Sequence, residues 1–283
     1  MAVSRTRRVM ENVVERVLLV CALLSVIVVL FITFFILQRG LPLFARVSVL
    51  KFLFTTYWLP TDATNPGFGI LSFIVGSLFV TFVALVIAVP IGLLCAIFLA
   101  EFASGRFASV LRRVIELLAG IPSVIYGFFG IVVVCRLVRE LLGGTGYSVL
   151  SGGIILAIMV LPTIITVAEV SIRSLPPEYK EGSLAIGATQ WQTVVRVLLP
   201  GARSGILAGI VLGIGRAVGE TMAVLMVAGN APIMPKGLLS MTRTLTMNIA
   251  TDMGYASGDH MTALFTTGIV LFLFCPAQDA LQV

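Results

Sequence analysis

The chain has 283 residues, of which 59% are hydrophobic and only 11% are charged, and its mean hydropathy is +1.11. A soluble domain of this size carries about 25% charged residues, so the composition excludes an ordinary water-soluble protein. The net charge of +6 does not indicate a nucleic-acid partner, because the Lys and Arg residues are spread among the segments that separate apolar runs. We therefore expect membrane lipid around the chain and no nucleic acid.

Six apolar runs follow one another along the chain, and we expect each to form a transmembrane helix. Runs of about 20 residues cross a hydrocarbon core of about 30 Å. Five runs have this length and the sixth is short; they are 17–37, 71–100, 114–135, 153–170, 204–228 and 262–275. Three runs contain a proline, which predicts kinks that neighbouring helices tolerate, namely Pro90, Pro122 and Pro162. The predicted fold class is an all-α polytopic membrane protein with six transmembrane helices, the last of them truncated.

The charges between the runs predict that both termini are cytoplasmic. With this orientation, eleven Lys and Arg residues lie inside, seven lie outside, and Arg216 lies within a span. Positive residues are enriched on the cytoplasmic side of membrane proteins. The predicted organisation is a basic cytoplasmic tail (1–16), a first transmembrane helix with an external loop (17–69), a main transmembrane domain (70–275) and an atypical polar tail (276–283).

A few polar residues stand near the predicted membrane boundaries. Glu101 and Glu116 are close in sequence to several arginines, which predicts a solvated charge cluster, and Glu169 can pair with Arg173 at helical spacing. His260 is the only histidine and cannot build a metal or catalytic site alone. We expect no catalytic residue, metal ligand or cofactor in this chain.

The most polar segment between runs is the loop at 171–203. Pro176-Pro177 suits a helix start, and Gly187 suits the residue just past a helix end. Thr189 and Gln192 form a Thr-x-x-Gln capping box for a second short helix, which we expect Pro200 to stop. Two short helices joined at Gly187 are predicted, with small residues that allow close approach of a partner's backbone.

The same loop carries an ordered motif: a Glu, two small residues, three others, a Gly, nine others, an aliphatic residue, any residue, Leu and Pro. Its residues are Glu181, Gly182-Ser183, Gly187, Val197, Leu199 and Pro200. The motif resembles the cytoplasmic EAA loop of ABC-transporter permeases, although Gly-Ser replaces the usual Ala-Ala. The resemblance implies that the loop faces the cytoplasm and docks an ATPase subunit through Glu181, Gly182, Ala185, Gly187, Leu199 and Pro200.

A second motif follows at 201–221. Small residues recur every four positions at Gly201, Gly205, Gly209, Gly213 and Ala217, a stripe that favours close helix packing. Arg216 and Glu220 lie beside the stripe and are four residues apart, so their side chains can meet. A charge at mid-membrane costs ~2.5–3.5 kcal/mol and usually marks a pathway. The residues alone leave open a static ion pair and a pathway in which Arg216 offers a transient charge to an oxyanion.

The run Gly-Arg-Ala-Val-Gly-Glu-Thr at 215–221 narrows the resemblance. The chain is similar to type I ABC-importer membrane subunits, and most closely to the PstC-type permeases of the bacterial phosphate-specific transport system. The resemblance covers 70–275 as a transmembrane type-1 domain, while 1–69 fits the family's extra N-terminal span and external loop. It implies a multi-pass protein of the bacterial inner membrane, with Arg216, Glu220 and Thr221 in the substrate pathway.

The resemblance also implies the partners and the energy source. They are a homologous second permease, ATP-binding ATPase subunits and an external phosphate-binding protein. No Gly-rich loop followed by Lys-Ser/Thr occurs in the sequence, so ATP hydrolysis is expected from a separate subunit. Three alternatives remain at this point: a permease for another oxyanion such as sulfate or molybdate, an ion-gradient-driven secondary transporter, and a sensor of phosphate status.

Overall fold

The computed structural model describes residues 5–62 and 64–279, with side chains described for 13–62 and 64–274. Its helices are α1 (Arg5–Gly40), α2 (Val49–Phe54), α3 (Leu71–Ile97), α4 (Gly105–Gly120), α5 (Ser123–Phe129), α6 (Arg136–Leu142), α7 (Val149–Arg173), α8 (Pro177–Ala185), α9 (Gln190–Thr193), α10 (Leu199–Gly201), α11 (Arg203–Gly219), α12 (Met222–Val227), α13 (Leu245–Asp252) and α14 (Gly258–Asp279). Neighbouring helices are joined by a 3-10 turn, η1 (Leu41–Ala45), and by three π-helical turns, η2 (Phe98–Phe102), η3 (Gly130–Cys135) and η4 (Val194–Leu198). Two short strands, β1 (Trp58–Leu59) and β2 (Gly67–Phe68), pair antiparallel outside the bundle.

Three helical segments of the described chain are long and apolar enough to cross a membrane: Val13–Ala45, Leu71–Phe102 and Val149–Arg173. They correspond to the predicted runs 17–37, 71–100 and 153–170, which are confirmed. Two bent helix pairs raise the number to five if each pair is one span, and Gly258–Phe274 is a shorter apolar helix. Pro90 and Pro162 lie inside α3 and α7, as predicted.

The predicted span at 114–135 is interrupted, because the chain bends by 96° between Gly105–Gly120 and Ser123–Leu142. Pro122 disfavours helical backbone at the residue before it, and Ile121 is accordingly extended, with ψ of 128°. The amphipathic helix α4 ends at Gly120, and the apolar segment of this pair starts anew at Ser123. An apolar run alone does not reveal such a corner.

The predicted span at 204–228 is also interrupted. Helix α11 ends at Gly219, and Glu220 is extended, with ψ of 130°, before α12 begins at Met222. At the C-terminal end, α14 extends through Asp279, so the predicted polar tail at 276–283 begins as helix, and residues 280–283 lie outside the described part. Residues 5–16 of the predicted basic tail form the start of α1.

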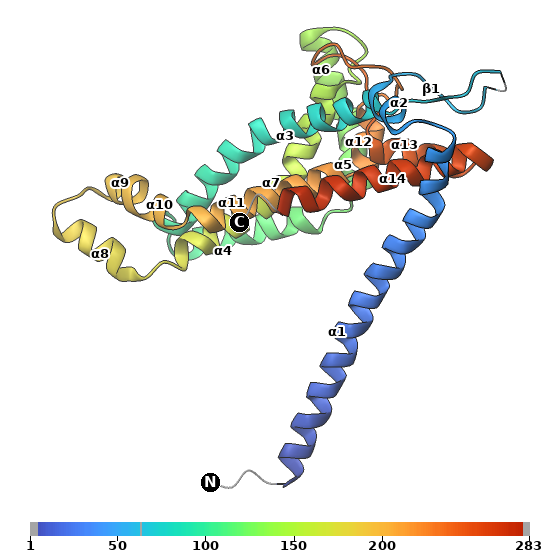
Figure 1. Cartoon of the computed structure of the whole chain (residues 1–283). Coiled ribbons are helices and arrows are strands. Elements are labelled where there is room, and N and C mark those ends of the chain that lie inside the picture. Colours follow the sequence, from blue (N-terminus) through green and yellow to red (C-terminus); the bar gives the residue numbers. More distant parts are fainter. Residues whose placement is uncertain (1–4, 63, 280–283) are drawn as a thin grey trace.

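The core of the bundle is the layer in which α7 packs between α3 and α11. Its buried residues come from all three helices, together with α12 and α13; they include Val80, Ala84, Leu156, Val160, Ile164, Ala217, Val224 and Met247. Glycine permits close packing here, because a Cβ added at Gly92 would lie 3.0 Å from Ile164 Cγ2. Figure 1 shows the polar hairpin of α8 and α9 at one end of this layer and α2, α13 and the strands at the other.

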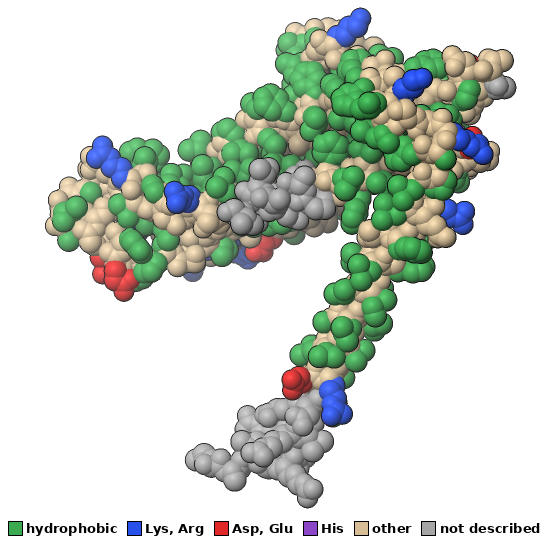
Figure 2. All heavy atoms as spheres, in the orientation of Figure 1, with side chains coloured by type: hydrophobic (Ala, Val, Ile, Leu, Met, Phe, Trp, Pro, Cys, Tyr) green, Lys and Arg blue, Asp and Glu red, His purple; other side chains and the backbone are tan. Residues whose placement is uncertain are grey.

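Among the residues that the structure describes, helix α1 contacts the bundle near its C-terminal end only (Figure 1). Gly40 packs against α14, where Thr266 Oγ1 donates to the Gly40 carbonyl at 2.8 Å, and α1 then runs away from the bundle (Figure 1). Its surface is almost continuously apolar between 13 and 37 (Figure 2), and none of the residues in its most apolar stretch is buried. Such a surface requires lipid or another membrane subunit around it.

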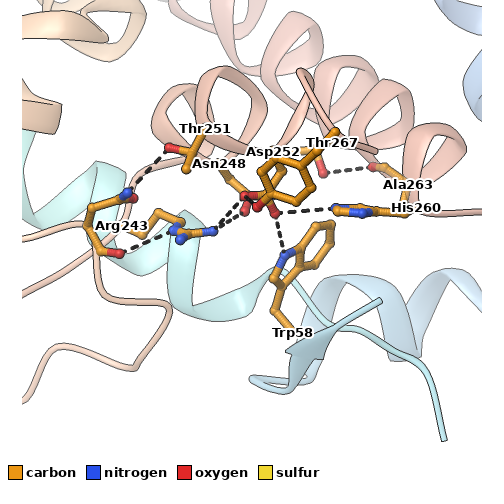
Figure 3. A network of polar contacts seen from close by, with 10 residues as sticks. Trp58, Arg243, Asn248, Thr251, Asp252, His260, Ala263 and Thr267 are labelled. Atoms are coloured by element: carbon orange, nitrogen blue, oxygen red, sulfur yellow. Dashed lines mark hydrogen bonds and ion pairs between the residues drawn. The ribbon is translucent and has the colours of Figure 1, made fainter. Parts of the chain in front are cut away.

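At the end of the bundle opposite the α8–α9 hairpin, the buried carboxylate of Asp252 binds four side chains, and this cluster is called the clamp below. Asp252 accepts hydrogen bonds from Trp58 Nε1 at 3.1 Å and from Tyr255 at 2.6 Å, and pairs with Arg243 at 3.2 Å and His260 at 3.3 Å (Figure 3). These groups join the external loop to α13 and α14. His260, the only histidine, is buried at the start of α14 as part of this clamp.

The clamp predicts a large loss of stability in Asp252→Ala. The variant leaves the cation of Arg243, whose side chain is only 12% exposed, without its carboxylate. Breaking a buried pair in this way costs about 3–5 kcal/mol of unfolding free energy. Denaturant unfolding of the purified protein in detergent measures the loss.

Asp62→Ala is the matched control, because Asp62 is a partly exposed aspartate of the same external loop that accepts hydrogen bonds from Thr64 and Asn65. We expect it to lower the unfolding free energy by less than about 1.5 kcal/mol. Equal losses in the two variants would contradict the clamp.

Candidate transport site and coupling surface

The polar hairpin, residues 176–201, consists of α8, α9, η4 and α10. The predicted corner at Gly187 is confirmed, because its φ of +90° lies in the region that favours glycine. The capping box is also confirmed: Thr189 Oγ1 accepts from the Gln192 backbone, and the Gln192 side chain accepts from the Thr189 backbone. The prediction that Pro200 stops the helix is wrong, because the helix ends one residue later, at Gly201. Pro200 lies at the start of α10, where its missing N–H is tolerated, and the chain turns by 71° only at Ala202.

The hairpin is held together internally and is tied to α3. The hydroxyls of Ser183 and Thr193 are 2.9 Å apart across the two arms. Lys180 Nζ lies 2.7 Å from Glu101 Oε2, and Gln190 Nε2 donates to the Glu101 carbonyl at 3.0 Å. Glu101 belongs to η2, which continues α3. The solvated cluster expected around Glu101 is therefore wrong, since this carboxylate is 9% exposed and pairs with the hairpin.

A second charge cluster lies beside the hairpin. Glu169, near the end of α7, accepts from Arg112 Nε of α4 at 2.8 Å and from Arg173 Nε at 2.9 Å, which confirms the expected pairing with Arg173. Arg173 Nη2 also donates to the Leu99 carbonyl at 2.6 Å in η2. The two clusters thus join α3, α4, α7 and the hairpin by ionic and hydrogen-bonded contacts.

The polar hairpin also carries apolar side chains on the face that points away from the bundle. They are Tyr179, Leu184, Ile186, Trp191 and Val195, and Ile186 is 87% exposed. A Cβ added at Gly182 would meet no atom within 4 Å, so packing within this chain does not require glycine there. Of the six residues predicted to couple to an ATPase, five are exposed and one, Leu199, is half-buried against the core; the exposed five are Glu181, Gly182, Ala185, Gly187 and Pro200. An apolar, small-residue surface outside the bundle suits a protein partner.

The small-residue stripe of α11 packs on α7. A Cβ added at Gly213 would lie 2.8 Å from Val160 Cγ1, and one added at Gly209 would lie 3.1 Å from Val167 Cβ. This close approach brings Arg216 to α7, where its Nη1 lies 3.4 Å from Thr163 Oγ1. Arg216 is half-buried in the bundle, as the stripe predicted.

The predicted contact between Arg216 and Glu220 is wrong in this structure. No ion pair joins the two within the described chain, because α11 ends at Gly219 and helical i,i+4 geometry does not extend to Glu220. Instead, Glu220 Oε1 accepts from the backbone N–H of Ala223 at 3.1 Å. The Thr221 hydroxyl donates to the Gly219 carbonyl at 3.3 Å within the same break.

Hydroxyl groups surround the break on its inner side. Thr246 Oγ1 donates to the Glu220 carbonyl at 3.1 Å, and Ser77 Oγ accepts from the Leu245 backbone at 3.0 Å. A cavity of about 10 Å³ is lined by Ser77, Thr81, Glu220 and Thr244 among others. This is room for about one water.

Five hydroxyls of this region belong to none of the sequence motifs: Thr163, Ser77, Thr81, Thr244 and Thr246. Ser77 and Thr81 are hydroxyls four residues apart within an apolar span, and this spacing is a signal that they share one helix face. The other hydroxyls carry no comparable signal. They reach the site only because α7 and the segment at 244–246 pack beside α11 and the break that follows it.

The comparisons agree with this architecture. The family model described as "Binding-protein-dependent transport system inner membrane component" matches residues 88–283. The chain is 41% identical to the probable ABC transporter permease protein YqgH of Bacillus subtilis over 277 residues, which cover 95% of this chain and 89% of that protein. It is 36% identical to the phosphate transport system permease protein PstC of Pasteurella multocida over 243 residues, covering 79% and 75% of the two chains.

Solved structures share the fold at low sequence identity. A bacterial ABC transporter involved in alginate import matches with a TM-score of 0.64 and 17% identity, covering 97% of this chain and 98% of that chain. The MetNI methionine ABC transporter matches with a TM-score of 0.56 and 20% identity, covering 76% and 93%. These matches establish the type I ABC importer permease fold. With its helical bundle and its relatives, the chain belongs to the family of binding-protein-dependent transport system inner membrane components, and it is a multi-pass permease subunit of an ABC importer.

Proposed function

We propose that this permease moves inorganic phosphate across the bacterial plasma membrane. The observation that carries the proposal is Arg216, a half-buried cation inside the bundle that contacts the Thr163 hydroxyl and no carboxylate within the described chain. A guanidinium with free donors matches the geometry of a phosphate oxygen pair. The phosphate transport permeases among its relatives support the choice of this anion.

Glu220 and Thr221 supply the second part of the proposed pathway. The break at Glu220 places a carboxylate four residues from Arg216 without tying the two together, so Arg216 is available to an anion. When the bundle opens, the carboxylate can compete with the anion for Arg216 and promote its release. A site that held phosphate tightly would trap it, and a neighbouring negative charge prevents this.

The energy for transport comes, in this proposal, from separate ATPase subunits that dock on the exposed apolar face of the polar hairpin. Lys180 and Gln190 connect that face to Glu101 at the end of α3, and Glu169 connects α7 to α4. Movement of the hairpin would therefore be transmitted to the helices of the core. A homologous second permease would complete the pore, and an external phosphate-binding protein would deliver the anion.

Phosphate uptake tests the role of Arg216 directly. Arg216→Gln removes the charged donor and keeps a polar side chain, and loss of a charged hydrogen bond of about 1.5–3 kcal/mol lowers uptake by about 10- to 150-fold. The assay measures labelled phosphate entering cells that lack their own high-affinity system and produce the complete transporter. Arg136→Gln, an exposed arginine of α6 paired with Glu140, is the control and keeps full uptake.

Undiminished uptake by Arg216→Gln at normal membrane levels would remove Arg216 from the pathway. If sulfate competes for uptake as well as unlabelled phosphate does, the cargo assignment is wrong although the pathway stands. If uptake persists without ATP and responds to an ion gradient, the chain works as a secondary transporter.

The docking surface is tested by Ile186→Asp. Ile186 is 87% exposed beside the Gly187 corner, so the change does not disturb the chain's own packing but places a charge in the proposed apolar interface. Burying an unpaired charge there weakens association by several kcal/mol, and we expect the ATPase to be lost on co-purification. Gly187→Arg is a less clean probe than Ile186→Asp, because a side chain at a φ of +90° is strained whatever docks there.

Lys236→Asp, an exposed change in the external segment between α12 and α13, serves as control and retains the ATPase. Co-purification of equal amounts of ATPase with Ile186→Asp and with the unchanged chain would rule out this face as the docking surface.

A further inference from the structure

The first external segment carries an unusual charge for its position. Arg39, Arg46 and Lys51 fall within 13 residues on the side of the membrane opposite the polar hairpin, where Lys and Arg are ordinarily depleted. Asp259 of α14 is the only carboxylate of the described chain that pairs with any of the three, and it binds Arg46 Nη1 through both oxygens at 2.7 and 2.9 Å. The segment therefore holds an excess of positive charge without a partner in the chain.

These cations surround two neighbouring surface cavities. One, of about 720 Å³, is lined by Arg46, Lys51, Tyr57, Asn65 and Asp259 among others. The other, of about 620 Å³, is lined by Arg39, Arg46, Asp259, Met261 and Phe265 among others. Leu43, Arg46 and Asp259 line both, so the two cavities adjoin along the Arg46–Asp259 pair.

The surroundings are those of a membrane boundary. Helix α1 ends at Gly40 and α14 begins at Gly258, so the cations stand where two apolar helices leave the hydrocarbon region. Arg39 lies 5.6 Å over the ring of Phe35, which in turn packs edge-on against Phe265 of α14 at 5.8 Å. Figure 2 shows Lys and Arg side chains at the upper end of α1, next to a mostly apolar surface.

The short helix α2 adds an apolar surface beside the cations. Its residues Val49, Leu50 and Phe54 are exposed, and Leu50 and Phe54 are 67% and 65% exposed. Lys51 projects from the same helix into the larger cavity. An exposed mixture of large apolar side chains and lysine is typical of segments that lie in the interface of a bilayer.

From this juxtaposition we infer that Arg39, Arg46 and Lys51 form a binding site for the phosphate headgroup of an anionic phospholipid in the outer leaflet. The two cavities receive the headgroup, the cations neutralise its phosphodiester, and the acyl chains lie along the exposed apolar surfaces of α1 and α2. Asp259 orients Arg46 and limits the affinity, because its carboxylate competes with the lipid for the same guanidinium. The site is separate from Arg216 and does not depend on the cargo of the transporter.

Lipid retention by the purified, delipidated full chain in detergent, together with the subunits that co-purify with it, tests the inference. The probes are phosphatidylglycerol and phosphatidylcholine of identical acyl chains, counted by native mass spectrometry. We expect preferential retention of phosphatidylglycerol, lowered about fivefold by Arg39→Gln and by Lys51→Gln, since each cation near a membrane surface contributes about 1 kcal/mol. Lys236→Gln and Arg136→Gln, two other external cations, leave retention unchanged.

The Arg46–Asp259 pair separates lipid binding from a structural role. Arg46→Gln lowers retention, whereas Asp259→Asn raises it, because the second change frees the guanidinium and removes a negative charge. A merely structural ion pair would give losses in both variants, and that result would overturn the inference. Equal retention of the two lipids, or no response to Arg39→Gln and Lys51→Gln, would also overturn it.

Two further results would assign the cations to another ligand and overturn the inference. Displacement of phosphatidylglycerol by inorganic phosphate, with no effect of equal sodium chloride, would mean a site for the free ion. Unchanged lipid retention in the Arg39 and Lys51 variants, together with lost binding of an acidic external protein, would mean a protein-docking surface.

Discussion

The close approach of α11 to α7 is the contact on which the interior of this permease depends. A Cβ added at Gly209 or Gly213 would lie 3.1 Å from Val167 Cβ or 2.8 Å from Val160 Cγ1, so the valine side chains of α7 pack directly on the backbone of α11. That packing places Arg216 beside Thr163 instead of in lipid. In a membrane, where apolar side chains gain little by leaving lipid, such backbone proximity is a main source of helix association.

The second constraint is that backbone groups freed from helices must find partners within the protein. At the break between α11 and α12, the Glu220 carboxylate accepts from Ala223 N, and Thr246 donates to the Glu220 carbonyl. The break is therefore stabilised by polar side chains that bind its freed backbone groups. It also separates Glu220 from Arg216, which contacts Thr163 and no carboxylate within the described part of the chain.

The two ends of the bundle are fixed by different polar clusters. At the hairpin end, Glu101 and Glu169 each join separate helices through ion pairs, so the exposed apolar face of the hairpin is mechanically connected to α3, α4 and α7. At the outer end, Asp252 clamps Trp58, Arg243 and His260 into one unit. Helix α1 runs away from this bundle (Figure 1) and none of the residues in its most apolar stretch is buried, so lipid or other membrane chains must cover it.

Local rules were sufficient for much of this structure. Hydrophobic run length located α1, α3 and α7, and backbone chemistry located the Gly187 corner and the Thr189 capping box, because each depends on residues close in sequence. The four-residue glycine spacing likewise predicted which face of α11 packs inward.

The tertiary structure decided where apolar runs break and which distant polar side chains pair, neither of which hydropathy reveals. The corner at Pro122 and the break at Glu220 lie inside apolar runs, and whether a proline or a charge kinks, breaks or leaves a helix depends on neighbours that accept its freed backbone groups. The pairing of Asp252 with Trp58 and of Glu101 with Lys180 joins residues far apart in the chain. By itself the sequence determined the class of protein and the elements that carry its motifs; the folded bundle determined which charges meet, because contacts between distant segments exist only after packing.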